Sequence, residues 1–343
     1  MKRMLNTLYI FTQGVSLHKE GEAILVKCEG ETHSKIPFIN LQSIVCFGNV
    51  WMSPTLAGAC LMHGITISYL TVYGRFVARV QGPVSGNVLL RRKQYRVSDT
   101  PEQAVHIARS IVTAKILNSR TLLQRTLRDH ESKIDKESME RVVAFLKNNA
   151  AKSLSENDMD VLRGIEGDSA RLYFSVFDQT IVTQKDDFKF SGRNRRPPLD
   201  RVNALLSFVY TLLYHDMRGA LEANGLDPAV GFLHRERPGR MSLALDLMEE
   251  FRSPIADRLV LSLINLRQLC AKDFSISKSG AVQLEEKARK ELVAEYQNRK
   301  QESVMHPFLK EEMHIGLVFQ VQAQLLARYL RGDLDGYPAY VWR

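Results

Sequence analysis

The chain has few of the features that mark secreted or membrane-spanning proteins. Its four cysteines are scattered over 343 residues without CxxC spacing, which argues against a zinc site or a disulfide framework and favours reduced, mostly buried thiols. The longest apolar run, around residues 202–213, is interrupted by polar residues and is too short to span a bilayer. No apolar signal segment follows the positively charged start. We therefore expect a soluble, cytoplasmic protein without a membrane partner.

Several catalytic motifs are also missing. The sequence has no P-loop, no GxSxG element and no dinucleotide-binding glycine pattern. The stretch Asp333-Leu334-Asp335-Gly336 lacks the downstream glutamate that a calcium loop needs. No cysteine has a local context that favours nucleophilic catalysis, although the sequence alone does not exclude it.

Positive charge is what the chain does have. The formal net charge of +9 favours an anionic partner such as nucleic acid. Residues 185–201 hold six basic side chains, interleaved with Phe188 and Phe190, which could stack on frayed bases; a flexible solvated loop is the alternative. The residues that we expect to contact DNA are Arg91, Arg92, Arg193, Arg195, Arg196 and Arg201. A second, weaker set of basic residues continues through Lys115, Arg120, Arg125 and Arg128.

The pattern of apolar residues changes period near residue 86. Short β-branched and aromatic runs before it predict strands around 8–11, 23–26, 43–47 and 65–70, and turns at Glu20-Gly21 and Tyr73-Gly74. Ser53-Pro54 predicts a short helix that stops at Gly64. The turn-rich stretch 83–87 marks the expected boundary. We predict an α+β protein with a small N-terminal β-rich domain, 1–86, and a larger all-α C-terminal domain, 87–343.

Helical periodicity dominates the second part. A helix begins at Thr100-Pro101, and the other predicted helices cover 136–149, 156–180, 199–223, 241–251, 255–272, 281–300 and 309–331. The helix 199–223 is the most apolar and should run through the centre of its domain, with Pro197-Pro198 setting its start.

Residues 231–251 carry the strongest chemical signal. His234 follows an apolar run, and Asp246, Glu249 and Glu250 are spaced so that one helix face would present all three carboxylates. An imidazole and several oxygens beside a buried surface can hold a divalent metal ion. The alternative is an ordinary solvated acidic face. Glu166, between Gly164 and Gly167, is a further acidic candidate, or it serves a helix N-terminus.

Three motifs together give the chain its resemblance to a known family. They are Gly164-Ile165-Glu166-Gly167 with the residues that follow, the segment 196–206 (RPPLDRVNALL), and Gly231-Phe232-Leu233-His234 with 245–249 (LDLME). In this order, over the whole chain, they resemble CRISPR-associated protein 1, the integrase subunit of the spacer-acquisition machinery. The segment DLMEEFR at 246–252 looks most like the type I-C branch.

The resemblance implies partners and residue roles. It implies a homodimer, two of which flank a dimer of CRISPR-associated protein 2, with CRISPR-associated protein 4 as a further candidate partner. Glu166, His234 and Glu249 would be metal ligands, and Asp246 an additional acidic residue of the catalytic site. Many relatives have aspartate in place of Glu249, which leaves open whether Glu249 or Glu250 reaches the ion.

The implied activity is that of a metal-dependent DNA integrase and endonuclease. A DNA 3′-hydroxyl would attack a phosphodiester of the CRISPR array, helped by Mg²⁺ or Mn²⁺, and short double-stranded DNA would be inserted. His234 could alternatively move a proton. Two other functions stay open: a non-catalytic DNA-binding scaffold, and a general structure-selective DNA nuclease that cleaves without joining.

Overall fold

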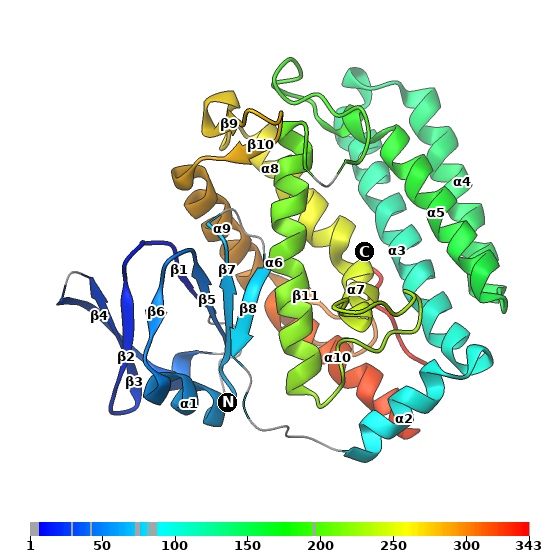
Figure 1. The fold of residues 1–343 in the computed structure, drawn as a ribbon. Coiled ribbons are helices and arrows are strands. Elements are labelled where there is room, and N and C mark those ends of the chain that lie inside the picture. Colours follow the sequence, from blue (N-terminus) through cyan, green and yellow to red (C-terminus); the bar gives the residue numbers. More distant parts are fainter. Residues whose placement is uncertain are drawn as a thin grey trace. The chain divides into compact units, whose positions relative to one another are not determined.

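The fold is mixed α+β, with a strand-rich first part and a mainly helical second part (Figure 1). The structure, a computed structural model, describes residues 7–28, 30–41, 43–72, 76–80, 82, 88–194 and 197–342. Contacts divide the chain into two units, residues 1–86 and 87–343. The predicted turn at Tyr73-Gly74 and the turn-rich stretch 83–87 lie outside the described residues.

The first unit contains two four-stranded sheets. One sheet has the order β1-β5-β7-β8, with three parallel strands and an antiparallel edge strand: β1 (Thr7–Ile10), β5 (Ser43–Phe47), β7 (Thr66–Leu70) and β8 (Phe76–Val80). The other has the order β4-β3-β2-β6: β4 (Glu31–Pro37), β3 (Ala23–Cys28), β2 (Ser16–Glu20) and β6 (Trp51–Met52). The strands expected from β-branched runs are confirmed, and the turn at Glu20-Gly21 joins β2 to β3.

A single apolar core joins both sheets to the helix α1 (Pro54–Met62). Ile24 of β3, Ile44 of β5 and Leu56 of α1 are all fully buried in it. The Ser53 hydroxyl accepts a hydrogen bond from the backbone N–H of Leu56, as the N-cap signal predicts. Gly64 has a φ of 70°, so this residue ends the helix in a conformation that glycine favours.

In the second unit three long helices lie side by side: α3 (Pro101–His130), α4 (Lys136–Ser155) and α5 (Met159–Ser175) (Figure 1). The central helix α6 (Arg201–Ala223) is buried along most of its circumference, as predicted, and packs against α7 (Ser242–Met248), α8 (Arg258–Asn265) and α10 (Ile315–Arg331). Asp200 caps α6 by accepting a 2.7 Å hydrogen bond from the backbone N–H of Asn203. The remaining helices are α2 (Val88–Ser98) and α9 (Glu286–Gln301).

The prediction of an all-α second domain is wrong, because two β-hairpins lie within it. One joins β9 (Phe274–Ile276) to β10 (Val282–Leu284), and the other joins β11 (Ser303–Met305) to β12 (Glu312–His314). Val282 and Leu284 are buried on one face of β10. Burial of every second residue is the pattern of a strand, not of a helix. The helices expected from 281 and 309 therefore begin only at 286 and 315.

The helices expected at 241–251 and 255–272 form one continuous helical segment instead. Between α7 and α8 the chain tightens into a 3₁₀ turn, Glu249–Phe251, and then widens into a π-helical turn, Arg252–Asp257. Pro254 lies in the widened turn, because a proline cannot donate a backbone hydrogen bond and clashes with an ordinary helical turn. These changes of pitch alter the directions in which the side chains of 249–257 point.

The described cysteines are free thiols, with Cys46 and Cys60 buried and Cys28 and Cys270 partly exposed. Among the residues that the structure describes, no helix is both long and apolar enough to cross a membrane.

Candidate active site

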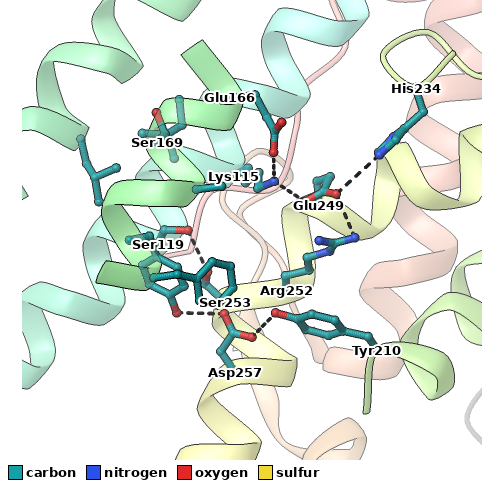
Figure 2. Close-up of a pocket in the computed structure, with 15 residues that line it drawn as sticks. Lys115, Ser119, Glu166, Ser169, Tyr210, His234, Glu249, Arg252, Ser253 and Asp257 are labelled. Atoms are coloured by element: carbon teal, nitrogen blue, oxygen red, sulfur yellow. Dashed lines mark hydrogen bonds and ion pairs between the residues drawn. The ribbon is translucent and has the colours of Figure 1, made fainter. Parts of the chain in front are cut away.

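A pocket of about 260 Å³ opens in the second unit between α3, α5, α6 and the segment 249–257 (Figure 2). Its charged lining comes from segments far apart in the sequence: Lys115, Glu166, His234, Glu249, Arg252 and Asp257. Three of the four predicted catalytic residues therefore lie at one pocket, and the fourth, Asp246, contacts one of them directly.

Asp246 on α7 holds the loop that carries His234. Its buried carboxylate accepts hydrogen bonds from the backbone N–H groups of Phe232, at 2.6 Å, and of Leu233 and His234, both at 3.0 Å. It also lies 2.6 Å from Nδ1 of His234. Because a carboxylate with these partners acts as an acceptor, the Nδ1 position carries the ring hydrogen and Nε2 keeps a lone pair in the neutral ring.

Gly231 makes this arrangement possible. A Cβ atom at position 231 would lie 2.7 Å from Oδ2 of Asp246 and 2.9 Å from the backbone carbon of Ser242, so only glycine leaves room for the carboxylate. The same loop is fastened from α2, where the Ser98 hydroxyl donates to the Gly231 carbonyl at 2.6 Å. From α5, the Nε of Arg163 donates to the Leu233 carbonyl at 2.9 Å. The local sequence thus orients the imidazole from three sides.

Nε2 of His234 points toward Glu249, whose nearest carboxylate oxygen lies 4.0 Å away. Glu249 itself is almost fully buried, in the 3₁₀ turn that follows α7. The alternative of an ordinary solvated acidic face is therefore wrong: Asp246, Glu249 and Glu250 are all buried. A buried carboxylate needs compensating charges or hydrogen bonds, and each of the three finds different ones.

Glu166 lies in the middle of α5, not near a helix start, since the N-cap of that helix is Asp158. Its side chain is about a quarter exposed and reaches the pocket. Nothing lies within 4 Å of a Cβ added at Gly164 or Gly167. Close approach of another part of the described chain therefore does not explain why these two positions are glycine.

Two cations that the sequence did not mark as site residues hold the glutamates. The ammonium of Lys115, on α3, contacts Glu166 and lies 2.8 Å from Oε2 of Glu249. The guanidinium of Arg252 lies 3.0 Å from the other oxygen of Glu249. Arg252 could have been suspected from the spacing of three residues after Glu249, but Lys115 belongs to a helix whose basic residues gave only a weak signal.

The charges around Glu249 decide its ionisation. Burial by itself would raise the pKa of Glu249, but Arg252, Lys115 and His234 outweigh it and lower the pKa to about 2. The ion pairs that Glu249 forms with Arg252 and Lys115 therefore keep its carboxylate ionised at neutral pH.

Asp257 lies at the base of the pocket between two buried tyrosines. The hydroxyl of Tyr173 donates to Asp257 at 2.8 Å and that of Tyr210 at 2.6 Å. Burial raises the pKa of Asp257 and of both tyrosines. The Arg252 guanidinium lies 4.9 Å from the Tyr210 ring centre, so this group of side chains fixes Arg252 beneath Glu249.

Glu250 points away from the pocket, so the prediction that the three carboxylates share one face is wrong. It accepts hydrogen bonds from the Tyr337 hydroxyl at 2.6 Å, the Tyr340 backbone N–H at 2.7 Å and the Gln322 amide at 2.9 Å. Burial raises the pKa of Glu250 to about 7, because these three donors are neutral and do not offset it. Glu250 fastens the C-terminal segment and does not line the pocket.

Of the predicted DNA contacts that the structure describes, none lines the pocket. Arg91 and Arg92 are on α2, and Arg195 and Arg196 lie outside the described residues. Arg193 donates a hydrogen bond to the side chain of Asn203, and Arg201 donates one to the Asp187 carbonyl, so both side chains already have partners within the chain. The prediction that the aromatic residues of this loop are available to stack on bases is wrong: Phe188 and Phe190 are buried, in contact with Phe274 and with Phe174 and Phe177 respectively.

The chemistry of the donor set fits a divalent cation. Glu166 and Glu249 direct oxygens toward one positive charge, and Asp246 leaves Nε2 of His234 available, which is the usual support of a metal-binding imidazole. As they stand, no three His, Cys, Asp or Glu side chains of the described ranges form a ready metal-binding group. The Lys115 ammonium lies where the two glutamates converge.

Comparisons with known proteins show the family to which the sequence is related. The family described as CRISPR associated protein Cas1 matches residues 8–298. The chain is 54% identical to the CRISPR-associated endonuclease Cas1 1 of Chlorobaculum tepidum, with 100% of both sequences covered. It is 35% identical to a CRISPR-associated exonuclease Cas4/endonuclease Cas1 fusion of Geobacter sulfurreducens, over 98% of this chain and 60% of the fusion.

Solved structures share the fold. A CAS1 protein from Thermotoga maritima has a TM-score of 0.81 at 25% identity, covering 95% of this chain and 97% of that chain. A chain of a Cas6-RT-Cas1–Cas2 complex has a TM-score of 0.82 at 25% identity, covering 100% of this chain and 36% of that larger chain.

Proposed function

The chain belongs to the CRISPR associated protein Cas1 family, and we propose that it is a metal-dependent DNA endonuclease and integrase. It inserts short DNA duplexes into a CRISPR array through attack of a DNA 3′-hydroxyl on a phosphodiester. Full-length similarity to a named endonuclease supports the class of reaction. The charged residues that line the pocket support its assignment as the place where that reaction occurs.

One observation carries the assignment. The Asp246–His234 pair aims Nε2 toward Glu249, while Glu166 and Glu249 converge on a single positive charge. We assign Glu166, His234 and Glu249 as ligands of Mg²⁺ or Mn²⁺, since carboxylate oxygens suit both ions and the imidazole favours Mn²⁺. Glu250 is excluded from this set because its carboxyl is engaged with the C-terminal segment.

Each side chain has a part that follows from its contacts. A bound divalent ion would polarise the phosphodiester and favour the alkoxide form of the attacking hydroxyl. Asp246 orients the His234 ring and fixes its tautomer, so Asp246 is a positioning residue. The positive charge of Arg252, 3.0 Å from Glu249, lowers the pKa of that carboxyl and keeps it ionised.

The same proposal extends to partners. The first unit would mediate homodimerisation, and two homodimers would bind a Cas2 dimer, in line with the Cas1–Cas2 complex among the structures with this fold. The fusion relative suggests Cas4 as a further partner. The segment DLMEEFR supports a type I-C assignment, and a chromosomal array as substrate implies the cytoplasm. Arg91, Arg92, Arg195 and Arg196 remain proposed contacts to duplex DNA.

A strand-transfer assay tests the function. The protein, with and without a Cas2 partner, is incubated with a short duplex and a supercoiled CRISPR plasmid in Mn²⁺ or in chelator. Joined product that requires metal and is lost in Glu166→Ala, His234→Ala and Glu249→Ala, with each variant still folded and bound to DNA, supports the proposal. Nicking without joining would instead indicate a structure-selective nuclease, and metal-independent binding without any product would indicate a scaffold.

A further inference from the structure

Lys115 occupies the most unusual position in the pocket. Its ammonium lies between Glu166 of α5 and Glu249 (Figure 2). It is 2.8 Å from Oε2 of Glu249, and the Lys115 side chain is only 13% exposed. Lysine is rarely buried unless it is paired, because desolvating an ammonium is costly. Here two carboxylates from different helical segments compensate the one charge.

We propose that Lys115 is a built-in counter-cation, which holds the place of the divalent ion and must move aside when the ion binds. This inference rests on the proposed function, since it concerns the same ligands. Two carboxylates directed at one point in a partly buried pocket repel each other unless a cation lies between them. In the metal-free protein Lys115 supplies that cation, and the ammonium and the metal ion therefore compete for the same oxygens.

The two cations that contact Glu249 differ in their freedom to leave. Arg252 is held from below, 4.9 Å from the Tyr210 ring centre, and binds the oxygen of Glu249 that faces His234. Lys115 binds the opposite oxygen, between the two glutamates, at the end of a flexible four-carbon chain. Lys115 is therefore the cation that a metal ion displaces, and Arg252 stays in place.

The competition has a thermodynamic consequence that does not depend on catalysis. Removing the ammonium should tighten metal binding, since the ion no longer has to displace it. The same change should destabilise the metal-free protein, because Glu249 is buried and loses one of its two close positive partners. Saturating metal should then restore the lost stability by mass action.

The test is Mn²⁺ binding to the full chain without DNA, measured by calorimetry and by the loss of the free-ion paramagnetic resonance signal. Lys115→Met keeps the length of the side chain and removes its charge, and should bind Mn²⁺ about tenfold more tightly than wild type. The matched control, Lys147→Met on an exposed position of α4, should bind as wild type does. In thermal unfolding, Lys115→Met should melt lower than wild type without metal and gain more from added Mn²⁺.

The outcomes separate this inference from the proposed function. If Glu249→Gln loses Mn²⁺ binding but Lys115→Met binds at or below wild-type affinity, the metal site stands and the role of Lys115 is wrong. If Glu249→Gln binds as tightly as wild type, the site assignment itself fails. Should Lys115→Met not fold without metal, Lys115→Gln takes its place, and refolding of either variant by Mn²⁺ alone is the expected result. Failure of both to gain stability from Mn²⁺ would contradict the inference.

Discussion

The pocket around Glu249 and the buried network around Glu250 shift the pKa values of two adjacent carboxyl groups in opposite directions. Burial opposes ionisation at both residues, yet the pKa of Glu249 falls to about 2 and that of Glu250 rises to about 7. Arg252 and Lys115 explain the first value, and the neutral donors on Tyr337, Tyr340 and Gln322 explain the second. Neighbouring positive charge therefore distinguishes the carboxylate that is ready to hold a cation from the one that fastens the C-terminal segment.

Neutralising each carboxyl group separately should have the largest and most different effects. Glu249→Gln should reduce strand transfer by about a thousandfold or more, because a proposed metal ligand is lost, whereas Glu250→Gln should keep most of it. Joined product on a supercoiled CRISPR plasmid is the readout, with circular dichroism to confirm that both variants are folded. Equal losses in the two variants would remove the distinction.

Truncating Glu250 should reveal its structural role. Glu250→Ala leaves the Tyr340 N–H, the Tyr337 hydroxyl and the Gln322 amide without their shared acceptor, so we expect a loss of about 2–4 kcal/mol in the free energy of unfolding. Tyr337→Phe, which removes one donor, should cost about 1 kcal/mol. Denaturant unfolding measures both. A Glu250→Ala variant as stable as wild type would show that the C-terminal segment is held by other contacts.

The two residues should also differ in their effect on stability between pH 5 and pH 8. The pKa of Glu250 is raised in the folded state, so its contribution to the free energy of unfolding is fully present below about pH 4.5. That contribution declines by up to about 3 kcal/mol as the pH rises toward about 7. The pKa of Glu249 is lowered, so its contribution is present above about 4.5 and is constant in this window. Wild type should therefore lose stability relative to Glu250→Gln from pH 5 to pH 8. A constant difference would contradict the raised pKa.

Asp246 is a third buried carboxylate, and its part is to position the proposed ligand His234. Gly231→Ala places a Cβ 2.7 Å from Oδ2 of Asp246, and the resulting shift of Asp246 and His234 should lower Mn²⁺ affinity by about 10–100-fold. Gly164→Ala, on an open face of α5, is the matched control and should leave affinity unchanged. If both variants bind alike, the close packing at Gly231 does not control the imidazole.

The sequence was informative where the signal is local. The loop Gly231–His234 and Asp246 lie within one short segment, so their association could be anticipated, and the apolar circumference of α6 correctly indicated a central helix. Glu166 was an acidic candidate from its position between two glycines, and the family resemblance connected it to His234, which local spacing could not do. The helix predicted at 156–180 contains Glu166, but the two flanking glycines left open whether this residue serves a helix N-terminus; in the structure it lies in the middle of α5.

Other features depend on tertiary contacts that no local pattern reports. Glu249 and Glu250 are chemically alike and adjacent, yet one reaches the pocket and the other Tyr337, a difference that depends on which distant segments pack against each side chain. Lys115 gains its role from helices that meet only on folding. The three-residue strands of the second unit are too short for their alternation to stand out against helical periodicity.

The most direct test of the central claim is the number of Mn²⁺ ions bound by wild type, Glu249→Gln and Glu250→Gln, measured side by side by paramagnetic resonance on the full chain at neutral pH. We expect one site in wild type and in Glu250→Gln, and none in Glu249→Gln. Binding that survives in Glu249→Gln and disappears in Glu250→Gln would contradict it, and would place the ion on the side of the segment that faces Tyr337.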